Sequence, residues 1–160
     1  MKARRIVLGL GALAGVAVLA ACTHEQGRLS FSPGYGLFYN DQGDTVALAY
    51  GLPNSDDVAL MLQCPKGSGR VEVSDSARDQ TATAIVLTAD GRKTSVPVRA
   101  ESGEGGDAKI LSGHLPLSAP ALQGLRRSGL IEVSSGHARY SIAVQAAQRA
   151  GVERFFRVCS

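Results

Sequence analysis

The stretch "AIVLTADGRKTSVPV" (residues 84–98) decides the fold class of this chain. Asp90-Gly91 at its centre supplies the positive φ angles of a tight two-residue turn. Pro97 has no backbone N–H to donate, which favours a place at the edge of a sheet. Apolar residues alternate with a period of two on both sides of the turn, as in half-buried strands: Ile85, Leu87, Val96 and Val98. The stretch therefore predicts an antiparallel hairpin with an edge strand.

The same period of two recurs along the chain in short apolar runs. Turn-rich segments separate the runs, namely "NDQGD" (40–44), "PNSDD" (53–57), "PKGSG" (65–69) and "SGEGG" (102–106). The segment 58–64 is ambiguous, since Asp56 and Asp57 could open a helix, although the following Pro-Lys-Gly would leave it short. The alternating residues are Val46, Leu48, Tyr50, Val58, Leu60, Leu62, Val71, Val73, Leu111, Leu115, Leu117, Ile131, Val133, Tyr140, Ile142 and Val144.

Two segments near the C-terminus carry helix signals. Residues 119–128 begin with an early proline and end with two arginines before Gly129, which predicts a short helix. Residues 145–159 place Val152, Phe155, Phe156 and Cys159 on one face of a second helix, which could begin or bend at Gly151. The chain is therefore predicted to be mainly β: an antiparallel β-sandwich or open barrel, with a short helix near 119–128 and a C-terminal helix packed on it.

The N-terminus has the three zones of a secretory signal peptide. Basic residues at positions 2, 4 and 5 precede an uncharged apolar run from residue 6 to 18, and "LAAC" (19–22) follows. The alternative is a transmembrane anchor, but the apolar run only approaches the roughly 20 residues that a spanning helix needs. Small residues rather than positive charges close the run, which favours the signal peptide.

The "LAAC" sequence resembles the lipobox of bacterial lipoprotein precursors, with Leu19, Ala20 and Ala21 before Cys22. The resemblance implies cleavage before Cys22 and attachment of a diacylglyceryl group and a further acyl chain, such as palmitate, to this residue. Two or more acyl chains give stable membrane anchoring. The expected organisation is a cleaved signal peptide (1–21), a lipidated N-terminus and tether (22–35), and a single β-rich domain (36–160).

The position after the cysteine bears on localisation. Thr23 follows Cys22, and by the sorting rule of enteric lipoproteins a residue other than Asp there implies export to the outer membrane. We therefore expect a protein of the cell envelope, held on a membrane by its N-terminal lipid and facing the periplasm.

The charge balance argues against nucleic acid as a partner. The whole chain has a net charge of +3, but residues 22–160 contain 14 basic and 14 acidic residues. A balanced chain lacks the basic excess that binding to nucleic acid or to anionic lipid requires, so we expect little salt-dependent binding to either beyond the lipid anchor. Aromatic residues are few and tryptophan is absent, so platforms for base stacking are not expected either.

The three cysteines indicate one disulfide. An odd number in an exported chain usually leaves one thiol over. Lipidation of Cys22 would resolve the count and leave Cys64 and Cys159 as a pair. Because compartments beyond the inner membrane are oxidising, we predict a disulfide between these two residues. The alternative is two separate buried thiols.

The sequence shows no catalytic motif. It lacks the G-x-S-x-G elbow of hydrolases, the S-x-x-K motif of penicillin-binding proteins and a P-loop. Ser68 lies between two glycines and is predicted to be a turn residue. Zinc requires three or four converging ligands, whereas the histidines are scattered at His24, His114 and His137. The acidic turns lack the spacing of an EF-hand loop; they contain Asp41, Asp44, Asp56 and Asp57. We therefore expect no enzyme activity, metal or cofactor.

Two further resemblances bear on the folded part. The last 45 or so residues, with a helix, two strands and a helix ending in Phe-x-x-x-Cys, resemble periplasmic proteins of the invasion-associated locus B type. The segment "SSGHARYS" (134–141) is similar to the S-G-x-x-Y signature of membrane-bound inhibitors of c-type lysozyme, but its tyrosine comes one residue late. That shift turns Tyr140 to the opposite face of a strand. We therefore favour a hairpin turn that leads into a strand with Tyr140 in the core.

These observations favour a membrane-anchored bacterial envelope lipoprotein that acts as a non-catalytic binding or structural module. Its partner would be an envelope protein or a cell-wall component. The alternative is a small-molecule or glycan-binding module, or an inhibitor of a cell-wall hydrolase, which would need a cleft with clustered polar and aromatic groups. A hydrolase with a dispersed site would need Ser, His and Asp converging in one cleft.

Overall fold

The predicted hairpin joins strand β5 (Ala84–Ala89) to strand β6 (Arg92–Pro97). Both turn residues have positive φ angles, 52° at Asp90 and 70° at Gly91, as the Asp-Gly sequence requires. Strand β6 lies at the edge of its sheet, which confirms the position expected from Pro97. The computed structural model describes residues 29–31, 33–76, 81–102 and 109–160.

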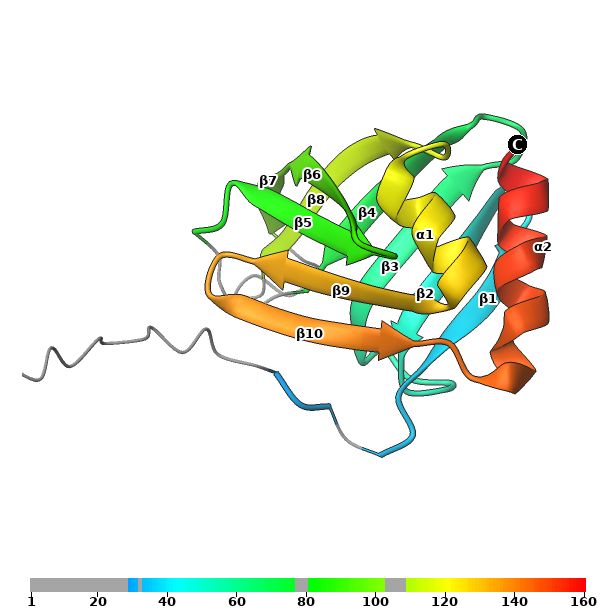
Figure 1. Ribbon diagram of the computed structural model, residues 1–160, viewed down its shortest axis with the longest axis horizontal. Coiled ribbons are helices and arrows are strands. Elements are labelled where there is room, and N and C mark those ends of the chain that lie inside the picture. Colours follow the sequence, from blue (N-terminus) through cyan, green and yellow to red (C-terminus); the bar gives the residue numbers. More distant parts are fainter. Residues whose placement is uncertain (1–28, 32, 77–80, 103–108) are drawn as a thin grey trace, which may run out of the picture.

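The strands form two antiparallel sheets that face each other across a shared core (Figure 1). The six-stranded sheet contains, in order, β1 (Gly36–Gln42), β2 (Thr45–Gly51), β3 (Val58–Pro65), β4 (Arg70–Asp75), β8 (Lys109–Pro116) and β7 (Arg99–Ser102). The four-stranded sheet contains β10 (Ala138–Ala143), β9 (Leu130–Ser135), β5 and β6. The ambiguous segment 58–64 is thus a strand, and the predicted mainly β sandwich is confirmed.

The chain passes directly from one sheet to the other between β6 and β7. Only Val98 separates the two strands, and its backbone N–H donates a hydrogen bond to the carbonyl of Thr83 (3.0 Å). Opposite this crossing, Gly113 of β8 approaches so closely that a Cβ there would lie 2.5 Å from the carbonyl oxygen of Pro97. The absence of a side chain at Gly113 therefore lets the two sheets meet at this corner.

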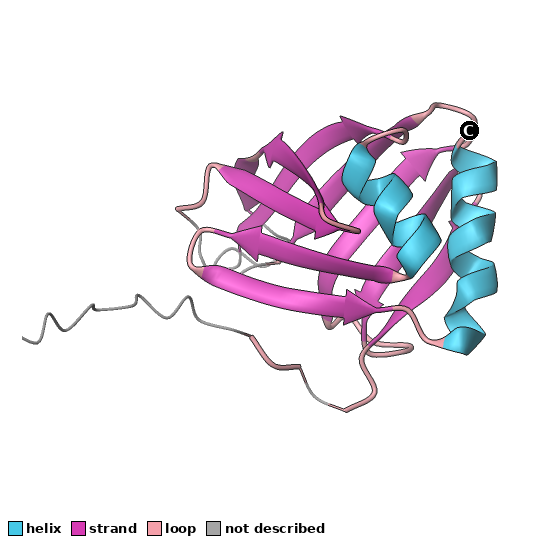
Figure 2. Cartoon of the chain, in the orientation of Figure 1, coloured by secondary structure: helices cyan, strands magenta, loops and turns pink. Residues whose placement is uncertain are grey.

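Both predicted helices are present. Helix α1 (Pro120–Ser128) begins at the early proline and ends at Gly129, which has a φ of 70° and donates its N–H to the carbonyl of Leu125 (2.8 Å). Helix α2 (Arg149–Cys159) follows a short 3₁₀ turn (Ala146–Gln148) and contains Gly151 in its first turn. Figure 2 shows that both helices lie on the same side of the six-stranded sheet as the four-stranded sheet.

The core lies between the six-stranded sheet on one side and the four-stranded sheet with both helices on the other. The apolar alternation found in the sequence points into it, so that Leu48, Leu62 and Val73 are almost fully buried. Helix α2 adds Phe155 and Phe156, and burial of each such large side chain stabilises the fold by about 1.5–3 kcal/mol. The apolar alternation of the strands and the apolar face of α2 thus account for which side chains form the core.

The predicted disulfide between Cys64 and Cys159 is confirmed. It joins the end of β3 to the last residue of α2, with a Cα–Cα distance of 6.0 Å. Both residues are fully buried. The turn after β3 strengthens the junction, because the N–H groups of Gly67 and Gly69 donate to the carbonyls of Val158 (2.9 Å) and Cys159 (2.8 Å).

Part of the predicted tether belongs to the domain. The backbone N–H of Leu29 donates a hydrogen bond to the carbonyl of Arg139 in β10 (2.8 Å). The Phe31 ring contacts the rings of Tyr35, Tyr50 and Tyr140 at centroid distances of 4.7, 5.4 and 5.1 Å. The described residues of the predicted tether, from Leu29 to Tyr35, therefore pack on the β-rich domain.

The predicted signal peptide, the lipidation site Cys22 and His24 lie outside the described residues, as does most of the turn predicted at 102–106. Within the described ranges, no helix has the length and apolar character needed to cross a bilayer.

Candidate functional site

The six-stranded sheet has an outer face, which is turned away from the helices and is not covered by another described element. Its outward side chains come from alternate strand positions, so the register places Phe38 beside Ala49 and Met61. The next row contains Asn40, then Ala47 and Gln63 of the neighbouring strands. Because β2 contributes only small side chains here, the larger residues of β1 and β3 stand on either side of a depression.

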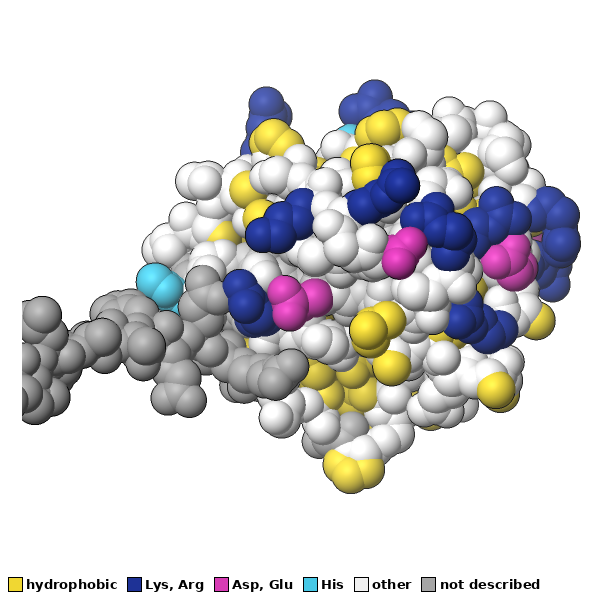
Figure 3. All heavy atoms as spheres, viewed as in Figure 1, with side chains coloured by type: hydrophobic (Ala, Val, Ile, Leu, Met, Phe, Trp, Pro, Cys, Tyr) yellow, Lys and Arg dark blue, Asp and Glu magenta, His cyan; other side chains and the backbone are white. Residues whose placement is uncertain are grey.

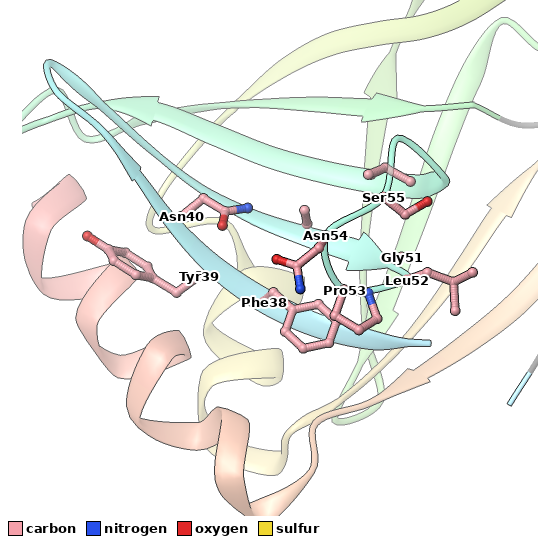
Figure 4. Close-up of a pocket in the computed structure, with 10 residues that line it drawn as sticks. Phe38, Tyr39, Asn40, Gly51, Leu52, Pro53, Asn54 and Ser55 are labelled. Carbon is pink, nitrogen blue, oxygen red and sulfur yellow. The ribbon is translucent and has the colours of Figure 1, made fainter. Parts of the chain in front are cut away.

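One end of this depression is a pocket of about 310 Å³, called here the Phe38 pocket. Figure 4 shows the side chains of Phe38, Asn40 and Asn54 directed toward it, whereas Tyr39 points away. Asn54 belongs to the β2–β3 loop and has a φ of 56°, a left-handed conformation that asparagine tolerates. The lining residues are Phe38, Tyr39, Asn40, Ala49, Gly51, Leu52, Pro53, Asn54, Ser55 and Val58.

The close approach of the β2–β3 loop shapes the pocket. A Cβ at Gly51 would collide with the backbone of Asp57 and Val58, so only glycine lets the loop fold back here. The loop is closed by the N–H of Leu52, which donates to the carbonyl of Asp57 (3.1 Å), and by the N–H of Asp57, which donates to the Ser55 hydroxyl (3.0 Å). The loop thereby holds Asn54 above the Phe38 ring.

The chemistry of the Phe38 pocket is aromatic and polar without charge. None of its ten lining residues is Asp, Glu, His, Lys or Arg. The exposed side-chain amides of Asn40 and Asn54 form no hydrogen bond with the described part of the chain, so both can donate to and accept from a ligand. A half-buried ring with two available amides on one side of it suits an uncharged ligand with hydroxyl or amide groups.

A second pocket of about 450 Å³ lies farther along the same face and brings Ser68, Glu72 and His114 together. His114 Nε2 is 4.0 Å from Glu72 Oε2, with both side chains about half exposed. The Ser68 hydroxyl is occupied locally: it accepts from the N–H of Arg70 (3.2 Å) and donates to the carbonyl of Arg70 (3.1 Å). No hydrogen bond joins Ser68 to His114 in the described structure, so the nucleophile–base pair that a serine hydrolase needs is not formed.

The remaining candidate ligands do not converge. His114 lies in β8 of the six-stranded sheet, whereas His137 lies in the β9–β10 turn of the other sheet. Among the described residues, no group of three or more His, Cys, Asp and Glu side chains could hold a metal ion. Asp41 instead pairs with Lys66 (2.8 Å), whose hydrogen bond lowers the pKa of this carboxyl group.

The sequence did not reveal a buried polar cluster around Asp75. This carboxylate is only 1 % exposed and accepts hydrogen bonds from the hydroxyls of Ser135 (2.9 Å) and Tyr140 (3.2 Å). Burial, reinforced by the negative charge of Asp75, raises the pKa of Tyr140 well above its usual value. The expected position of Tyr140 in the core is confirmed, and the "SSGHARYS" segment joins the two sheets.

Comparisons of this chain with protein-family models, with curated proteins and with solved structures give no match.

Proposed function

We propose that this protein is a non-catalytic binding module of the bacterial cell envelope, and that it binds an uncharged glycan of the cell wall in the Phe38 pocket. The observation that carries the proposal is the pocket itself, where the available amides of Asn40 and Asn54 lie on the same side of the Phe38 ring. The combination of one aromatic ring with two amides supports the glycan-binding alternative drawn from the sequence. The Ser68 geometry supports a binding role over hydrolysis.

The pocket suits a saccharide for two physical reasons. The apolar face of a sugar ring packs against an aromatic ring, and Phe38 supplies such a surface. Hydroxyl and acetamido groups need partners that both donate and accept, which a carboxamide provides. Because charge is absent from the lining, a neutral ligand loses less solvation there than a phosphate or carboxylate would.

The test is calorimetric titration with neutral chitin-type oligosaccharides and with soluble fragments of peptidoglycan glycan strands. The variant Phe38→Ala removes the ring, and Met61→Ala is the matched control because Met61 is half-buried on the same face but outside the pocket. We expect saturable binding that Phe38→Ala weakens at least about tenfold, through the loss of an aromatic contact of about 1.4 kcal/mol. No binding, or equal losses in the two variants, would contradict the glycan proposal.

The envelope location is a separate part of the proposal and rests on the lipobox resemblance at Cys22. We propose that Cys22 is lipidated and that Thr23 directs the protein to the outer membrane. Mass spectrometry of membrane fractions is expected to find a diacylglyceryl group and an acyl chain on an N-terminal Cys22, and Cys22→Ser should accumulate as uncut precursor. Release of Cys22→Ser as normal mature protein would refute the anchor.

A further inference from the structure

We propose that the anchored domain rests on the anionic surface of its own membrane through one face, called here the basic face. This face is the outer surface of the four-stranded sheet together with α1, α2 and the β5–β6 turn. The inference rests on the proposed lipid anchor and adds an orientation to it. Four observations carry it: an excess of unpaired cations, an exposed leucine among them, a negative opposite face and the short distance to Cys22.

The basic face carries more cations than its acidic residues can pair. Three acids are present and each already has a partner: Asp90 with Arg127 (2.9 Å), Glu153 with Arg126 (2.8 Å) and Glu132 with Arg139 (3.7 Å). Four basic residues of this face form no ion pair within the described structure: Arg92, Lys93, Arg149 and Arg157. Figure 3 shows this gathering of Lys and Arg side chains over α1 and α2.

Contacts between the elements make these cations one continuous surface. The Asp90–Arg127 pair joins the β5–β6 turn to the end of α1, and the Arg126–Glu153 pair joins α1 to α2. The guanidinium of Arg149 donates to the carbonyl of Ser128 (2.7 Å) at the C-terminus of α1. The same guanidinium also donates to the carbonyls of Arg126 (3.2 Å) and Arg127 (3.4 Å), so the negative end of the α1 dipole balances part of its charge, and no carboxylate of the described residues pairs with it.

An exposed leucine lies on the same face. Leu130, the first residue of β9, is 53 % exposed, and no other large hydrophobic side chain in the described residues is classed as exposed. Its cross-strand neighbour is Ala143, also on the outer surface. Cations around an apolar side chain match a bilayer interface, where headgroups attract the charges and the leucine enters the boundary with the acyl chains.

The opposite face has the reverse charge. The outer surface of the six-stranded sheet carries Glu72 and Glu101 beside Arg70 and Arg99. Its described loops and strand ends add Asp44, Asp56 and Asp57 against Lys109, while Lys66 is paired with Asp41, so the acidic residues exceed the basic ones by two. An anionic bilayer therefore attracts the basic face and repels the opposite one. The balanced total charge of residues 22–160 conceals this separation.

The proposed anchor keeps the bilayer within reach of the basic face. Leu29 is fixed to Arg139 at the edge of β10, a strand of the four-stranded sheet. Leu29 is seven positions after Cys22, and a fully extended chain of that length spans at most about 25 Å. The bilayer is therefore the anionic surface present at the highest effective concentration.

The experiment uses residues 22–160 with the Cys22 thiol coupled to a maleimide lipid in vesicles, so it does not depend on lipidation in cells. Cys64 and Cys159 do not react because they form the disulfide. Acetylation of lysines is then followed by mass spectrometry on phosphatidylglycerol vesicles and on phosphatidylcholine vesicles. We expect protection of Lys93, which lies on the basic face, on the anionic vesicles alone, and no change at Lys109 of β8.

Two double variants with the same change in charge test which face binds. In co-sedimentation of uncoupled, Cys22-blocked chain with phosphatidylglycerol vesicles, Lys93→Glu with Arg157→Glu is expected to weaken binding about 30-fold or more. The matched control, Arg70→Glu with Arg99→Glu on the opposite face, is expected to keep the affinity of the parent chain. Leu130→Ser, at an exposed position, should weaken binding without changing its salt dependence.

Three results would overturn the proposal: no preference for anionic vesicles, equal losses in the two double variants, or tighter binding to a soluble acidic polysaccharide than to the vesicles. The result for the basic face can be distinguished from the result for the lipid anchor. If Cys22 proves not to be lipidated in cells while the vesicle results hold, the anchor fails and the basic face remains a membrane-binding surface.

Discussion

Removal of the disulfide between Cys64 and Cys159 is expected to destabilise the protein strongly without changing its fold. The bond spans a sequence separation of 95 residues, and the loop-closure entropy of the unfolded chain values such a link at about 4–5 kcal/mol. Helix α2 should stay docked, because Val152, Phe155 and Phe156 remain buried and each contributes about 1.5–3 kcal/mol. The loss therefore acts mainly on the unfolded state.

The assay is urea unfolding followed by circular dichroism, for the oxidised protein, the reduced protein and the Cys64→Ala, Cys159→Ala double variant. We expect a near-native spectrum in water for all three, a loss of about 4–5 kcal/mol in the free energy of unfolding on reduction, and a melting temperature lower by about 15 °C. The double variant is the control for the reductant, since its urea unfolding curve must be the same with and without reductant. The reasoning is refuted if verified reduction costs less than about 1 kcal/mol.

Three further predictions concern the core. Gly124→Ala should cost about 1–3 kcal/mol by overpacking, since its Cβ would lie 2.7 Å from the carbonyl oxygen of Ala89, and an unchanged urea midpoint would contradict this. Tyr140→Phe should cost about 1–3 kcal/mol because it removes the hydrogen bond to Asp75, whereas a neutral result would show that this bond adds nothing to folding. Burial raises the pKa of Tyr50 and Tyr140 above the ordinary value of 10.0. Their contribution to the free energy of unfolding is therefore complete below about pH 10 and is lost as the pH rises further. Absorbance titration of tyrosinate, together with urea midpoints at each pH, checks this, and full ionisation of both residues near pH 10 in the folded state would contradict it.

The fold could be predicted where the signal is local. The Asp90-Gly91 turn, the proline and glycine at the ends of α1 and the apolar face of α2 each depend on neighbouring residues, and all three were found. Strand β1 was missed because only Leu37 of "GLFYNDQ" is buried among its large side chains, and the polar end of the segment resembles a loop. Its strand conformation comes from pairing with β2 over seven residues, a tertiary interaction.

The candidate site could not be predicted because it, too, depends on tertiary contacts between segments that are separate in the sequence. Phe38 and Asn54 meet only because β1 and the β2–β3 loop are both neighbours of β2, and neither residue belongs to a motif. The cluster around Asp75 likewise needs β4 to face β9 and β10 across the core. The separation of charge between the two faces could not be predicted either, because a count of charged residues carries no information about which face they share.

The two proposals constrain each other through the geometry of the sandwich. The Phe38 pocket lies on the outer face of the six-stranded sheet, and the basic face lies on the opposite layer, so a domain that rests on the bilayer through Leu130 and Arg149 presents the pocket to the aqueous side. A pocket that faced the membrane would be closed to a cell-wall polymer. If chain coupled to vesicles through Cys22 binds oligosaccharides as well as free chain does, both assignments are compatible. A loss of binding on coupling would mean that the bilayer covers the pocket, and the proposed orientation would then be wrong even if each surface binds its ligand in isolation.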